Sequence, residues 1–402
     1  MTTVRAAARS NFWALPGSDI SLNVCPQMDF VHRAGVMSTD AFRSLMDVPV
    51  VGAPLSGGAS TSELAAAVSE AGGFGFLAAG YKTAVEVQRE IEHVRTRTQR
   101  PFGVNLFFPT KLPVDETAVS DYIEGLAGEA ERYGVPCGEP RWSDDEWEGK
   151  LELVARERPA VVSFTFGCPA SAIVAQLRGH GIAVWCTVTR PAEAKVATAA
   201  GVDALVVQGS EAGGHQASFD DTDAAPVGLL ALLQLVRKAT DLPLVAAGGI
   251  ANGEAVAGVI AAGAAAAQIG SALMLTPEAG TSPPHRAAFK ADAPTALTRA
   301  FTGRRARGIV NRFMRDHDAA APKAYPQVHY VTVPLRAAAR AAGDAEGINL
   351  WAGQVYPLAE AAPAATLVAR WGAEAHAVLR RRSGTADRGR GCCHHSSSGC
   401  HR

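Results

Sequence analysis

The chain has 402 residues, of which 48% are hydrophobic and 19% are charged, and its formal net charge is −1. This length allows a sizeable core in one large domain or two ordinary ones. The balanced charge gives no electrostatic case for binding nucleic acid or an anionic membrane. The cysteines lack the paired spacing of metal ligands, and no apolar signal-peptide run follows the N-terminus, so we expect a cytoplasmic protein without disulfides.

Eight short apolar runs alternate with helix patterns, after an N-terminal arm (1–39) that shows little periodicity. The predicted strands are 49–53, 74–79, 101–107, 160–166, 183–188, 204–207, 242–246 and 265–269. This alternation predicts a parallel α/β sheet, and eight strands are the number that closes a (β/α)8 TIM barrel, here over 40–276. A doubly wound open sheet is the alternative, but no predicted strand is followed by the G-x-G-x-x-G dinucleotide fingerprint.

Capping residues indicate where several helices begin. Thr83 is the predicted cap of the helix after the second strand, and Asn252 of the helix after the seventh. Thr189 is the predicted cap of the helix whose first residue is Pro191. A longer polar, helical section with a break around 134–142 precedes the fourth strand.

The alternation fails between residues 277 and 348. Segments rich in Ala, Arg and Pro predict a small, mostly helical insertion after strand eight, with one extended piece near 328–333. Residues 349–382 are predicted as a return segment and the closing barrel helix. The segment 383–402 is expected to be a disordered tail, and because its Cys-Cys-His-His run has no predicted fold around it, we expect no metal site there.

The sixth strand leads into a Gly-rich loop, in the run ALVVQGSEAGGH that ends at His215. Gln208 stands at the carboxyl end of the strand, and the loop glycines, Gly213 among them, let the backbone turn sharply and approach a ligand. His215 is the one side chain of the loop with an ordinary pKa near neutrality. Because parallel strands bind ligands at their carboxyl ends, His215 is a candidate reactive residue; a simple turn with an exposed histidine is the alternative.

Two further loops predict a phosphate site. Gly248 and Gly249 follow the seventh strand and precede a helix that begins near Asn252, while Gly270 and Ser271 follow the eighth strand. The loops after strands seven and eight are the usual phosphate site of a (β/α)8 barrel, built from backbone N–H groups and a helix dipole.

Three amides lie at or near the carboxyl ends of strands, namely Asn105, Gln208 and Gln268. Burying an amide is costly unless it finds a hydrogen-bond partner, and a heterocycle with several carbonyls and ring nitrogens would supply partners. A phosphate next to a flat polar ring predicts FMN as the cofactor. Motifs of α/β-hydrolases, zinc proteases and P-loop proteins are absent from the sequence.

These residues resemble the nitronate monooxygenase family, formerly called 2-nitropropane dioxygenases, which are FMN-dependent (β/α)8 enzymes. The likeness covers 47–274 and 350–354, and Gln-Gly-x-Glu-Ala-Gly-Gly-His is its most specific motif. The resemblance implies that His215 is catalytic and that the insertion covers the substrate. It also implies FMN contacts from Ala53, Pro54, Asn105, Gln208, Gly213, Gly249, Gln268, Ile269, Gly270 and Ser271.

The activity implied by the resemblance is the oxidation of alkyl nitronates, and of nitroalkanes, by O2 to carbonyl compounds and nitrite. His215 would take the α-proton of a neutral nitroalkane or, as an imidazolium, hold the nitro oxygens. The scaffold also resembles flavin-dependent reductases, so an NAD(P)H-dependent flavin reductase acting on an enoyl thioester or a quinone is an alternative, and a non-flavin phosphate-binding barrel is another. Trp351, in the return segment, either walls the substrate pocket or packs under the closing helix. The oligomeric state is left open.

Overall fold

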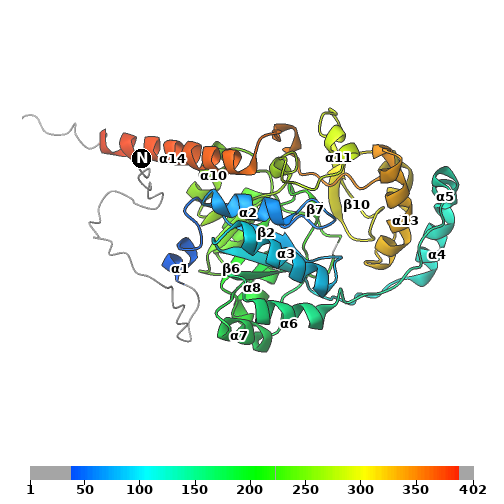
Figure 1. Cartoon of the computed structure of the whole chain (residues 1–402), viewed down its shortest axis with the longest axis horizontal. Helices are drawn as coiled ribbons and strands as arrows, with labels where there is room; N and C mark the ends of the chain where they lie inside the picture. Colours follow the sequence, from blue (N-terminus) through cyan, green and yellow to red (C-terminus); the bar gives the residue numbers. More distant parts are fainter. Residues whose placement is uncertain (1–37, 222, 389–402) are drawn as a thin grey trace, which may run out of the picture.

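The computed structural model describes residues 38–221 and 223–388 (Figure 1). Nearly all of the predicted N-terminal arm and the Cys/His-rich end of the tail lie outside these residues. Eight parallel strands form one sheet: β1 (Val50–Gly52), β2 (Gly75–Ala78), β3 (Phe102–Phe107), β4 (Val161–Thr165), β5 (Ala183–Val188), β6 (Ala204–Gln208), β8 (Leu244–Ala247) and β9 (Ala266–Ile269).

The sheet closes on itself. Its strand order is β1-β9-β8-β6-β5-β4-β3-β2, and a parallel bridge between Val51 and Phe74 joins the two ends of this order. A helix follows each strand: α2 (Ser62–Glu70), α3 (Ala84–Arg97), α6 (Trp147–Glu157), α7 (Ser171–Gly179), α8 (Pro191–Ala200), α9 (Leu229–Arg237), α10 (Gly253–Ala261) and α14 (Ala364–Arg388). The predicted (β/α)8 TIM barrel is therefore confirmed.

Local capping explains why several of these helices begin where they do. Thr83 and Glu86 form a reciprocal capping box at α3, and the Asn252 side chain accepts from the N–H of Ala255 at α10, so both predicted caps are confirmed. The predicted cap of α8 is wrong by one residue. The helix begins at Pro191, so Arg190 stands at the cap position, where its side chain makes no capping bond, while the N–H and hydroxyl of Thr189 both donate to the carboxylate of Glu193.

A short helix closes the amino-terminal end of the barrel. α1 (Thr39–Arg43) carries the buried Phe42, whose ring stacks on that of Trp185 with centroids 5.4 Å apart. Phe74 and Phe76 complete this aromatic cluster. Because this end is filled by side chains, ligands are left with the carboxyl end of the strands.

The insertion after β9 contains two strands besides its helices. Its elements are η1 (Ser271–Leu273), α11 (Pro283–Ala288), β10 (Thr295–Thr298), β11 (Ala306–Ile309), α12 (Arg312–His317), η2 (Asp318–Ala320), α13 (Gln327–Ala341) and η3 (Ala345–Gly347), and η4 (Tyr356–Leu358) follows in the return segment. The predicted extended piece at 328–333 is wrong, since these residues form the first turns of α13. The β-branched run there buries Val328, Val331 and Thr332 at helical spacing.

The insertion shares its core with the helical section between β3 and β4. α4 (Glu116–Gly125) and α5 (Ala127–Tyr133) lie beside α13, at the end of the molecule away from α14 (Figure 1). Val119, Tyr122 and Leu126 pack against Phe301 and Phe313 of the insertion. The covering layer above the barrel is therefore built from two separate stretches of chain.

The closing helix α14 packs against α10 and α2 and continues to Arg388, beyond the boundary at 382 that the sequence predicts. Residues 383–388 are therefore helical, while 389–402 lie outside the described residues. Among the residues that the structure describes, no helix is long and apolar enough to cross a membrane.

Candidate functional site

A cavity of about 370 Å³ opens at the carboxyl ends of the barrel strands, beneath the insertion. Eleven of the predicted site residues line it: Ala53, Pro54, Asn105, Gln208, Gly213, His215, Gly249, Gln268, Gly270, Ser271 and Trp351. Ile269 is the exception. Its side chain lies in the core between the strands and the outer helices, and only its backbone oxygen, which accepts from the N–H of Ala53, reaches the strand end.

His215 is held by the insertion as well as by the barrel. It belongs to β7 (Gly214–His215), which pairs antiparallel with β11 in a three-stranded sheet with β10. From the barrel side, Gln208 donates to the His215 carbonyl (3.0 Å) and accepts from the N–H of Ala217 (2.8 Å). Gln208 therefore clamps the loop, and both ends of its amide are used by the protein itself.

The imidazole of His215 is oriented by a hydroxyl. Its Nε2 lies 2.9 Å from Oγ1 of Thr302, and this oxygen lies 3.2 Å from the carbonyl oxygen of Arg304. Since a hydroxyl can only donate to a carbonyl, Thr302 accepts from Nε2–H of His215. The nitrogen left to take a proton is Nδ1.

His215 is neutral at neutral pH. Its ring is surrounded by those of Phe166, Tyr325 and Trp351, with centroids 5.6–5.7 Å away. Burial, and then the positive charges of Arg304 and Arg336, lower the pKa of His215 to about 3. In the free protein the imidazole is therefore unprotonated, and an imidazolium that holds nitro oxygens is disfavoured.

Arg304 keeps the loop after His215 in place. Its buried guanidinium lies over the ring of Phe166, 4.0 Å from the centroid, and donates to the carbonyl oxygens of Gln216 and Ser218. The sequence shows Arg304 only as one of several arginines before β11. Its role depends on β11 pairing with β7, which no local pattern indicates.

The other two amides differ in what they offer the cavity. Asn105 donates through Nδ2 to Ser163 and Thr165, so its Oδ1 is the end left to accept a hydrogen bond. Gln268 makes no hydrogen bond to any other described residue through its side chain, and it lines the cavity. Oδ1 of Asn105 and the side-chain amide of Gln268 are therefore available for hydrogen bonds to a ligand in the cavity.

The loops after β8 and β9 present backbone donors. The N–H groups of Gly249, Gly270 and Ser271 donate to no other residue in the described ranges, and all three residues line the cavity. Gly249 has φ +69°, a conformation that side chains other than glycine rarely adopt. At the N-terminus of α10, the N–H of Gly253 is already used, because it donates to the carboxylate of Glu374 (3.0 Å) on α14.

The return segment explains why one of the predicted residues is a glycine. A Cβ on Gly213 would lie 2.4 Å from the backbone nitrogen of Gly353, and this same N–H donates to Oγ of Ser271 (2.8 Å). Glycine at position 213 therefore allows the backbone of the return segment to pass close to this loop. Trp351, two residues earlier, is half-buried and lines the cavity.

Several residues of the cavity wall have no counterpart among the sequence predictions. His329 stacks on Tyr81 with centroids 4.0 Å apart, and Arg336 and Asn349 line the wall from the insertion side. Thr281 Oγ1 and His285 Nε2 are buried, line the cavity and have no hydrogen-bond partner in the described residues. The sequence lacked a signal for Thr281, His285, His329 and Arg336, because they come from the segment where periodicity fails.

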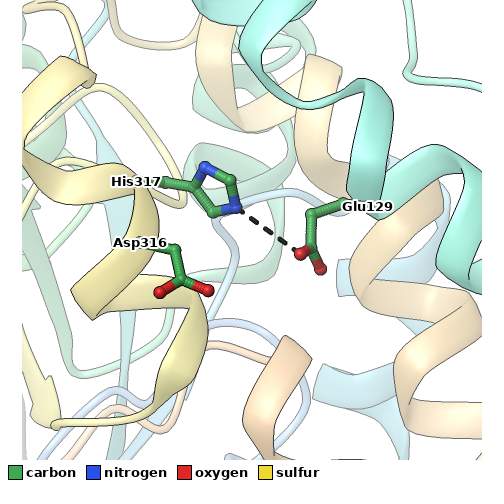
Figure 2. A group of neighbouring side chains, drawn as sticks. All are labelled: Glu129, Asp316 and His317. Atoms are coloured by element: carbon green, nitrogen blue, oxygen red, sulfur yellow. Dashed lines mark ion pairs between the residues drawn. The ribbon is translucent and has the colours of Figure 1, made fainter.

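A second polar cluster lies away from the cavity. Glu129 from α5 approaches Asp316 and His317 from α12 (Figure 2) at the spacing of potential metal ligands. Both carboxylate oxygens of Glu129 are already bound by the guanidinium of Arg312, which also contacts Asp316 (3.2 Å). This cluster is an ion-pair network that joins the two halves of the covering layer.

Comparison with known proteins gives the family. The profile for nitronate monooxygenase matches residues 41–373. The chain belongs to the nitronate monooxygenase family. The nitronate monooxygenase of Pseudomonas aeruginosa is 41% identical over 344 residues, which are 82% of this chain and 97% of that protein. The enzyme of the same name from Paraburkholderia phytofirmans is 37% identical, over 81% of this chain and 91% of that protein.

A solved structure agrees with this assignment. The nitroalkane oxidase of Streptomyces ansochromogenes is 48% identical, covers 87% of this chain and 100% of its own, and superposes with a TM-score of 0.83. The family consists of flavin-dependent oxidoreductases, so the chain is an enzyme of this class.

Proposed function

We propose that this enzyme binds FMN in the cavity and oxidises alkyl nitronates, and nitroalkanes after their deprotonation, with O2 to carbonyl compounds and nitrite. The observation that carries the proposal is a neutral His215 facing the same cavity as a set of free backbone donors and amides. The relatives named for nitronates and nitroalkanes support the substrate class.

The cavity residues fit FMN chemically. Gly249, Gly270 and Ser271 offer N–H groups without internal partners, as a phosphate requires. Oδ1 of Asn105 and the amide of Gln268 match the donors and acceptors at the edge of a flavin ring. When bound, FMN supplies the electron acceptor for the oxidation.

His215 then acts as the base for neutral nitroalkanes. Nδ1 takes the α-proton, while Thr302 and Gln208 hold the imidazole and its backbone in place. The product of this step is the nitronate anion, the same species that enters directly when a preformed nitronate is the substrate. The insertion covers this reaction and keeps bulk water away from it.

Two measurements test the proposal. Denaturing the purified protein and identifying the released chromophore by mass should yield FMN; a colourless protein that takes up no FMN would favour a non-flavin barrel. Under anaerobic conditions, a nitronate should bleach the flavin absorption and NADH should not. Bleaching by NADH alone would instead assign the reductase alternative.

A further inference from the structure

Arg336 is a buried charge without an anionic partner. It is 7% exposed, and its guanidinium donates to Oγ1 of Thr332 (3.0 Å), Oδ1 of Asn349 (3.2 Å) and the backbone oxygen of His329 (3.0 Å). Within the described ranges, no carboxylate lies within 4.0 Å of it. Although burial lowers the pKa of Arg336 to about 10, the group stays protonated at neutral pH. Burying an unpaired charge is costly, so such a group calls for an anion.

Asn349 is oriented by this arginine. Because a guanidinium has only donors, the amide oxygen of Asn349 must face Arg336, and the NH2 end is turned elsewhere. This NH2 group binds no other described residue, and Asn349 and Arg336 both line the cavity. The second N–H of Nη1 is likewise left over after the bond to Asn349. The wall therefore presents two adjacent donors, one of them charged.

The position of this pair relates it to His215. Asn349 lies two residues before Trp351, whose ring centroid is 5.6 Å from that of His215. Arg336 is one of the two positive charges that lower the pKa of His215. The other arginine that acts on His215 is Arg304. Its guanidinium donates to the backbone oxygens of Gln216 and Ser218, and it does not line the cavity. Arg336 is therefore the buried arginine that a small ligand can reach.

We propose that Arg336 and Asn349 form an anion-binding subsite that receives the oxygen atoms of the nitronate. This inference rests on the proposed function and names the residues that select the substrate. The subsite favours the nitronate anion over the neutral nitroalkane from which the anion derives. It also holds the anion that forms when His215 removes the α-proton. Nitrite, a small oxyanion with the same oxygen geometry, should occupy the same donors and compete with the nitronate.

The test measures sodium nitrite binding to the oxidised holoenzyme, from the change in flavin absorption and independently by calorimetry. Arg336→Met should weaken nitrite binding roughly 10- to 100-fold, the usual worth of a charge-assisted hydrogen bond. Arg336→Lys should restore most of the loss, and Asn349→Leu should weaken binding roughly 3- to 10-fold. Arg315→Gln removes the same charge from an exposed position on α12 and is the matched control.

Kinetics give a second readout. In Arg336→Met the KM for a nitronate should rise by a factor close to that of the nitrite dissociation constant, while the KM for the neutral nitroalkane should change far less. An Arg336→Met enzyme with intact FMN content and wild-type nitrite binding would overturn the subsite, as would equal KM changes for both substrates.

If Arg336→Met does not fold, Asn349→Asp provides a second test of the subsite. A carboxylate at this position pairs with Arg336 and repels nitrite, so retained nitrite affinity in this variant contradicts the proposal. Failure of the proposed function gives a different pattern: nitrite binding that depends on Arg336, in an enzyme that oxidises no nitronate.

Discussion

The barrel faces the cavity with backbone N–H groups, neutral amides and the rings of Tyr81, Phe107 and Phe166, whereas the insertion faces it with arginines, hydroxyls and imidazoles. The barrel groups, such as Gly249 and Asn105, come from strand ends whose positions are fixed by the closed sheet. The insertion groups, such as Thr302 and Arg336, come from a layer that rests on the barrel and is joined to it through β7. We infer that the barrel holds the cofactor and that the insertion sets the reactivity of His215 and the choice of substrate.

The sharpest way to break this comparison is at His215, where the two regions meet. His215→Asn keeps a polar side chain of similar size, so FMN should stay bound, but turnover of a neutral nitroalkane should fall roughly 10²- to 10⁴-fold. This corresponds to about 3–5 kcal/mol of lost transition-state stabilisation. A preformed nitronate has already lost its proton and should be oxidised at a rate much closer to that of the wild type.

Steady-state kinetics with both substrates check this expectation. Equal losses on the two substrates would assign His215 to anion binding, which its low pKa disfavours. Unchanged kinetics on both would show that the loop is structural, and the division between barrel and insertion would then have no catalytic meaning.

The barrel side is tested at Gly249. Its φ of +69° strains any β-branched residue, so a valine there should displace the loop whose free N–H groups we assign to the phosphate. Gly249→Val should therefore purify largely without FMN. Gly263→Val is the matched control, because Gly263 has φ +99°, open space around it and no contact with the cavity. Full flavin content in Gly249→Val would argue against the phosphate assignment.

Acid should separate the two regions by stability. Burial lowers the pKa of His215 to about 3 and that of His285 to about 4, and it also lowers the pKa of His329. In the unfolded chain these imidazoles bind protons below about pH 6.5. Since the unfolded state then binds more protons than the folded state, stability should decline as pH falls from about 6.5 toward about 4.

The melting temperature between pH 7 and 4 measures this effect. His285→Gln should flatten part of the decline, because it removes one of the groups that titrate on unfolding. A melting temperature independent of pH over this range would contradict the burial of these imidazoles. Hydrogen exchange should show the covering layer opening before the barrel, because all three histidines lie in or against that layer.

How far the sequence predicts the structure also differs between the two regions. The barrel strands are short apolar runs with Gly and Pro at their ends, so local periodicity was enough to place all eight. The pairing of β11 with β7 and the packing of Tyr122 against Phe301 join residues far apart in the chain, and no local pattern reports them. His215 was found through its loop, whereas Arg336, Asn349 and Thr302 were not found.

The smallest expected effect concerns Trp351, which the sequence places either in the wall of the substrate pocket or under the closing helix. The structure places its half-buried ring in the cavity wall, 5.6 Å from the ring of His215, and its other side against Phe301 of the insertion core. Trp351→Ala should therefore raise the KM for the nitronate a few-fold, by roughly the worth of part of an aromatic contact, and lower the melting temperature only modestly. Trp371, a residue of α14 that is 1% exposed, is the matched control. Trp371→Ala should cost about 3–5 kcal/mol of stability through the cavity that it leaves, with KM unchanged in the enzyme that remains folded. If the two variants instead lose similar stability and Trp351→Ala keeps its KM, Trp351 belongs to the core of the insertion, and the wall of the substrate site must be sought at Arg336 and Asn349 alone.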